Sequence, residues 1–76
     1  MPSLTVKGAD AMRNIIQYFS NQDKFSANEL SIKCGKKFVA ATLNALVGHE
    51  LLIKHPTSPV RYSMTHNCEE LFIALL

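Results

Sequence analysis

The residues of this sequence best suited to chemistry are its basic side chains, which gather in one part of the chain. Five of the eight Lys and Arg residues fall between positions 33 and 61: Lys33, Lys36, Lys37, Lys54 and Arg61. Glu50 is the only acidic residue within that span. Clustered cations of this kind bind nucleic acid by replacing the counterions around its phosphates. The alternative is that they are ordinary solvated lysines that keep a loop in solution.

Other reactive side chains form no catalytic or metal-binding pattern. Cys34 and Cys68 are too far apart in sequence to be a chelating pair, and the three histidines do not complete a ligand set around them. Paired carboxylates occur only at Glu69-Glu70, whose side chains would point in different directions on a helix. The scattered glycines do not make a phosphate-binding loop. We therefore expect no enzymatic activity, no cofactor and no bound metal.

Length and composition predict one small domain that occupies residues 1–76. The 47% hydrophobic content is enough for one core and too high for a disordered chain. Two cysteines are fewer than a small secreted domain stapled by disulfides needs, so we expect both to be reduced. No apolar stretch is long enough to span a bilayer, and the N-terminus lacks the apolar segment of a signal peptide. We expect a cytoplasmic protein with no membrane partner.

The pattern of apolar, capping and turn residues along the chain predicts the elements that position these cations. After a β-prone lead at 4–6, apolar residues recur with the period of an amphipathic helix, at Ala9, Met12, Ile15, Ile16 and Phe19. A polar loop at 20–24 follows. Ser26 and Glu29 then form a capping box that predicts a helix from Ala27, about two turns long, with Leu30 and Cys34 facing inward.

Gly35 is suited to the left-handed residue that ends this short helix. A third helix is predicted a few residues later, with an inward stripe of Val39, Leu43, Leu46 and Val47 and with Phe38 packed beside it. Segments 51–54 and 60–64 are predicted to form two strands, which are separated by a turn at 56–59. Asn67 is placed to cap a terminal helix from Cys68 to Leu76.

The predicted fold is mainly α with a small β-hairpin, in the order helix, helix, helix, strand, strand, helix. From Phe25 to Thr65 the chain resembles the winged helix-turn-helix regulators, and it looks closest to the MarR-like branch of bacterial and phage transcription factors. The likeness lies in residues 25–30, 39–47, 51–54 and 61–65. It implies a helix-turn-helix at about 26–48, a wing at about 51–64 and a C-terminal helix at about 67–76.

The resemblance implies a small DNA-binding transcriptional regulator without enzymatic activity. The third helix would lie in the major groove of double-stranded DNA, with Lys37, Ala40, Ala41 and Asn44 facing the bases and the wing on the backbone. Alanine offers only a methyl group, whereas Asn44 can bond adenine through two atoms, or can simply be a polar residue on an exposed face. This leaves modest specificity, recognition of DNA shape, or no DNA target.

The C-terminal helix predicts a partner surface. Its apolar residues fall on two sides, and one core contact cannot bury both: Leu71, Phe72 and Leu75 on one side, Ile73 and Leu76 on the other. A homodimer formed through this helix is the preferred interpretation, and a helix that only seals the core is the alternative. A second functional hypothesis is a winged helix that binds protein, such as a phage or host adaptor docking on polymerase.

Overall fold

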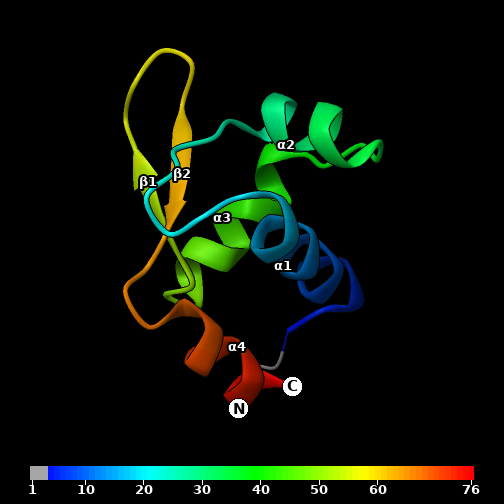
Figure 1. Cartoon of the computed structure of the whole chain (residues 1–76), viewed down its shortest axis with the longest axis vertical. Coiled ribbons are helices and arrows are strands. Elements are labelled where there is room, and N and C mark those ends of the chain that lie inside the picture. The colour runs from blue at the N-terminus through cyan, green and yellow to red at the C-terminus, as the bar shows by residue number, and fades with distance from the viewer. Residues whose placement is uncertain (1–3) are drawn as a thin grey trace.

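The chain forms four helices and one antiparallel hairpin (Figure 1). The structure is a computed structural model that describes residues 4–76. Its elements, in chain order, are α1 Val6–Tyr18, α2 Ala27–Cys34, α3 Ala40–Gly48, β1 Leu52–His55, β2 Arg61–Met64 and α4 Cys68–Leu75. The hairpin loop and α2 lie at one end of the long axis, and α4 lies at the other. The predicted mainly helical class with a small hairpin is therefore confirmed.

Helix α1 is the element around which the other helices pack, since it contacts α2, α3 and α4. Its inward stripe includes Ala9, Met12 and Ile15, all buried, as the sequence period predicts. The prediction of a β-prone lead at 4–6 is wrong, because α1 already begins at Val6. Thr5 is the N-cap, and its hydroxyl oxygen accepts the amide N–H of Gly8 at 3.0 Å.

Helix α2 begins where the capping box predicts. The Ser26 hydroxyl accepts the Glu29 amide at 3.1 Å, and the Glu29 carboxylate accepts the Ser26 amide at 3.2 Å. Gly35 ends the helix in the left-handed conformation with φ 71°. Leu30 is fully buried as predicted, whereas Cys34 is only half-buried.

Strand β1 is shifted by one residue from the predicted 51–54, and β2 begins one residue after the predicted start at 60. Their register places Leu52 opposite Met64 and Lys54 opposite Tyr62. A third short segment joins the sheet, because Phe25 and Tyr62 exchange two backbone hydrogen bonds of 2.8 and 2.7 Å. This bridge fixes the chain that enters α2 against the free edge of β2.

One apolar core lies between the helices and the inner side of the hairpin. Every helix and strand contributes a fully buried side chain to this core. The largest include Met12, Phe25, Leu43, Leu52 and Tyr62. Cys68 at the start of α4 is also buried, and this burial together with the nearby Glu69 carboxylate raises the pKa of its thiol to about 11. None of the helices described within residues 4–76 is long and apolar enough to cross a membrane.

Candidate nucleic-acid interface

Helix α3 presents one face to solvent, and that face carries small side chains and one amide. Leu43 and Leu46 are buried beneath the helix, and Val47 packs partly against the core. The exposed residues follow the opposite stripe, and we call them the outward face of α3: Ala40, Ala41, Asn44, Ala45 and Gly48. The structure thus places the predicted Ala40, Ala41 and Asn44 together on an open surface. Ala45 belongs beside them and was not predicted.

The predicted inward stripe of α3 is wrong at its first residue. Val39 is 46% exposed and is the N-cap, so that the helix begins at Ala40. Its backbone is extended, with φ −103° and ψ 156°, and its side chain therefore does not continue the helical stripe of Leu43. Phe38 is half-buried against the core instead, as expected. No side chain of the described residues caps this end of α3.

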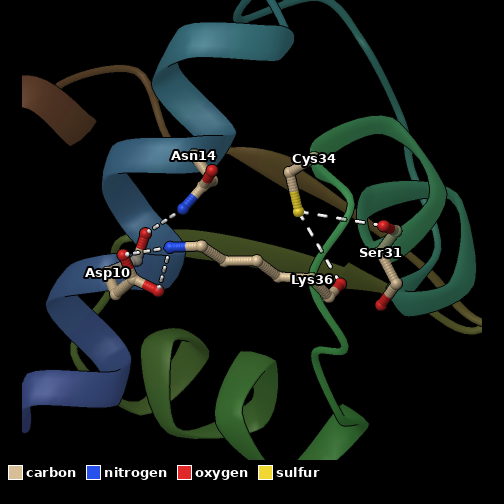
Figure 2. A network of polar contacts seen from close by, with 5 residues as sticks. All are labelled: Asp10, Asn14, Ser31, Cys34 and Lys36. Carbon is tan, nitrogen blue, oxygen red and sulfur yellow. Dashed lines mark hydrogen bonds and ion pairs between the residues drawn. The ribbon is translucent and has the colours of Figure 1, made fainter.

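The three predicted cations before α3 differ in what they contact. The Lys36 ammonium lies 3.2 Å from both carboxylate oxygens of Asp10 on α1, and its side chain extends across the gap between the two elements (Figure 2). The Lys33 ammonium lies 5.7 Å from the centre of the Phe19 ring, within the range of a cation–π contact. Lys37 is exposed and forms no ion pair with any residue in 4–76.

The two predicted cations of the hairpin lie on opposite faces of it. Lys54 pairs with Tyr62 across the strands and Arg61 pairs with His55, and side chains of successive pairs alternate between the faces. The Arg61 Nε atom lies 3.7 Å from a carboxylate oxygen of Glu29 in the capping box. Lys54 is exposed, has no ion pair within the described part of the chain, and shares the face of Tyr62.

Tyr62 connects the hairpin to α3 and is the main site residue that the sequence interpretation missed. Its hydroxyl donates a hydrogen bond of 2.8 Å to the Asn44 Oδ1 atom. The side chain is 2% exposed, and burial raises the pKa of its phenol. Asn44 is exposed, and within residues 4–76 its Nδ2 group has no hydrogen-bond partner, so this group is available to an acceptor on another molecule. A tyrosine within the predicted strand 60–64 was the only sequence signal for this contact.

Two hollows adjoin α3 along α1. The first is an open, mainly apolar depression of about 490 Å³, called here the alanine hollow, lined by Thr5, Val6, Lys7, Ala41, Thr42 and Ala45. The second, of about 140 Å³, is called the lysine hollow and is lined by Lys7, Asp10, Lys36, Lys37, Phe38, Val39 and Thr42. Lys7 contributes to both, and no sequence pattern connected it with α3.

The remaining reactive side chains form structural contacts. The Cys34 thiol lies 3.9 Å from the Ser31 carbonyl oxygen and 3.8 Å from that of Lys36 (Figure 2). On the hairpin, His55 Nε2 and the Ser63 hydroxyl are hydrogen-bonded at 2.8 Å. Residues 4–76 contain no group of three or more acidic, His or Cys side chains arranged to hold a metal ion.

The predicted dimer residues of α4 divide into two sets. Phe72 is 6% exposed and packs in the chain's own core, with Leu71 and Leu75 partly buried beside it, so that Phe72 cannot meet a partner. This corrects its assignment to the interface, because the first apolar side of α4 is used to cover α1 and the core. Ile73 and Leu76 stay 70% and 66% exposed.

Comparison with known proteins gives no relative from which a function could be transferred. No family model matches the chain, and neither do any of the curated proteins or solved structures that were searched. The function must therefore be argued from the geometry of α3 and its surroundings.

Proposed function

We propose that this chain is a small transcriptional regulator that binds double-stranded DNA through a winged helix-turn-helix made of α2, α3 and the hairpin. In this proposal α3 enters the major groove, the hairpin lies on the backbone, and the protein acts in the cytoplasm. The observation that carries it is the outward face of α3, which is exposed along its length. Lys37, just before the helix, and Lys54, on the neighbouring β1, form no ion pair with any residue in 4–76.

The small side chains of this face support a close approach to DNA. Ala40, Ala41 and Ala45 add little bulk, so the α3 backbone can lie deep in the groove, where methyl groups meet the methyl of thymine. Asn44 supplies the only amide on this face, and its Nδ2 group can donate to an acceptor on a base edge. Its orientation is fixed by Tyr62 before DNA binds, which lowers the entropy cost of the contact.

A homodimer extends this proposal. Ile73 and Leu76 are large apolar side chains exposed on α4, at the end of the molecule opposite the hairpin loop. Pairing of two copies through them would present two α3 helices to half-sites on one duplex. Sedimentation of the wild-type chain and of Ile73→Glu tests this step, with a shift from dimer to monomer expected in the variant.

The experiment that tests DNA binding is fluorescence anisotropy with a labelled random-sequence duplex across a salt series. Binding with a strongly negative slope of log affinity against log salt supports the proposal. Lys37→Glu and Lys54→Glu are each expected to weaken binding to every sequence by about tenfold. Lys24→Glu makes the same charge change in the loop after α1 and is the matched control, with a change below about threefold expected.

Asn44→Ala separates base recognition from phosphate contact. The variant is expected to relax preference at one base pair, worth about 1–3 kcal/mol, and to leave the salt slope unchanged. Its free energy of unfolding is measured in parallel, because the substitution also removes the partner of the Tyr62 hydroxyl.

One observation favours a second candidate function, a winged helix that binds protein. The alanine hollow runs from Ala41 and Ala45 to Val6, which is 88% exposed, and an apolar depression of this kind suits a protein surface such as one on polymerase. Absence of duplex binding at low salt, by the wild-type chain and by the lysine variants alike, would favour this candidate over DNA.

A further inference from the structure

The lysine hollow concentrates positive charge from two parts of the chain that are distant in sequence. Lys7 comes from the first turn of α1, whereas Lys36 and Lys37 come from the segment that enters α3. Among the described residues that line it, Asp10 is the only acidic one. Three lysines and one aspartate in the lining leave a surplus of two positive charges, and a volume of about 140 Å³ suits a single small anion.

The only carboxylate of the hollow is already engaged. Lys36 contacts both oxygens of Asp10 at 3.2 Å, and Figure 2 shows its side chain extended toward α1. Asn14, the other polar neighbour drawn there, donates to the backbone oxygen of Asp10 and not to its carboxylate. The pair is exposed, at 55% for the Lys36 side chain and 39% for that of Asp10. An exposed pair of this kind is weak, so that another anion can take Lys36 from Asp10.

We propose that the lysine hollow is a phosphate-binding site, in which Lys7, Lys36 and Lys37 contact one phosphate group and Asp10 competes with it for Lys36. In the free protein Asp10 holds Lys36 across the hollow. When a phosphate enters, Lys36 turns to it and the Asp10 carboxylate returns to water. The identification of this phosphate as part of a duplex backbone rests on the proposed function. The affinity of the hollow for a phosphate ion does not depend on that function.

Asp10→Asn is the first test, because it removes the competitor and leaves the shape of the side chain. Affinity for the random duplex at 50 mM salt is expected to rise about fivefold. Glu70→Gln on α4 is the control, because it makes the same change in net charge. Glu70 lies near Asn21, beyond the end of α1 that is far from Asp10, and the variant is expected to raise affinity by less than about twofold. Equal effects of the two variants would overturn the role of Asp10.

Lys7→Gln is the second test, since nothing in the proposed function requires Lys7. We expect about three- to tenfold weaker duplex binding and a salt slope smaller in magnitude by about 0.9, which corresponds to one lost phosphate contact. Lys24→Gln is the matched control and should leave the slope as it is. An unchanged slope for Lys7→Gln would remove Lys7 from the site.

Titration of the ¹⁵N-labelled protein with inorganic phosphate distinguishes this inference from the proposed function. Amide shifts confined to the segment 36–42 and the first turns of α1, and stronger in Asp10→Asn, support the site whether or not the protein binds DNA. Duplex binding by the wild-type chain with no such phosphate shifts, and with equal effects of Asp10→Asn and Glu70→Gln, would overturn the site and keep the DNA proposal. Phosphate shifts without duplex binding would keep the site and refute the DNA proposal.

Discussion

The two sides of α3 are alike in charge and different in what supports them. On the side of the turn, Lys36 is paired with Asp10 and Lys37 has no ion partner among the described residues. On the side of the hairpin, Arg61 is paired with Glu29 and Lys54 has no such partner. The hairpin is anchored by the buried Tyr62 of β2, whereas the lysines around the lysine hollow on the turn side are exposed.

This difference indicates that the two sides contribute to function in separate ways. The position of the hairpin is set by burial, by the Phe25 bridge and by the hydrogen bond to Asn44, so substitutions there should change the stability of the fold. At the lysine hollow the contact between Lys36 and Asp10 is a solvated ion pair, so substitutions of the lysines should change anion binding and leave stability nearly unaltered.

The largest effect is expected for Tyr62→Ala. Truncating a fully buried aromatic leaves a cavity between the hairpin and α3, and should lower the free energy of unfolding by about 3–5 kcal/mol. Urea denaturation followed by circular dichroism measures the loss. Tyr18→Ala, at a tyrosine that is 39% exposed, is the control and should cost far less. Similar losses for both variants would contradict the burial of Tyr62 between the hairpin and α3.

Tyr62→Phe should have a smaller effect, of about 1 kcal/mol, because it removes only the hydroxyl that donates to Asn44. A double-mutant cycle with Asn44→Ala measures the coupling of the two side chains. Additive losses in the cycle would show that the hydrogen bond does not fix the hairpin to α3.

A pH titration tests the burial of Tyr62 directly. Burial raises the pKa of its phenol above the ordinary 10.0, so the unfolded chain releases the proton first as the pH rises. Any contribution of this group to stability is therefore constant below pH 10 and is lost as the pH rises through the raised pKa. Phenolate absorbance in Tyr18→Phe, where Tyr62 is the only tyrosine left, should show a midpoint above pH 10. A midpoint at or below 10 would refute the burial.

The smallest effect on stability is expected on the turn side. Lys36→Gln breaks the exposed ion pair with Asp10 and should lower the free energy of unfolding by less than about 0.5 kcal/mol. The same urea experiment measures it. A loss as large as that of Tyr62→Phe would mean that the Lys36–Asp10 pair holds α3 against α1, and that the lysine hollow is structural.

The sequence predicted the fold where local chemistry decides it. The Ser26–Glu29 capping box and Gly35 located both ends of α2, because each residue acts on its own backbone. Val39 was assigned to the stripe of Leu43 by spacing alone, and spacing does not reveal that an N-cap has an extended backbone. The orientation of Ala41 and Asn44 was predictable, since a helix with Leu43, Leu46 and Val47 against the core places these residues on another side.

The contacts that define the candidate site were not predictable in the same way. Lys36 and Asp10 are 26 residues apart, and only the packing of α1 beside α3 brings them together. The Tyr62–Asn44 hydrogen bond likewise depends on where the hairpin sits on α3, and the Phe25 bridge is a single residue pair without a strand pattern. Phe72 was assigned to an interface because the sequence does not show which apolar side of a terminal helix meets its own core.

The most direct test of the central claim is to map where a duplex touches the ¹⁵N-labelled protein. A random-sequence duplex at low salt is expected to shift the amide resonances of residues 37–45 and of the hairpin around Lys54, and to leave those of 69–72 in α4 almost unchanged. Shifts confined to α4, or none at any salt concentration that keeps the protein folded, would contradict the proposal that the outward face of α3 is a DNA-binding surface.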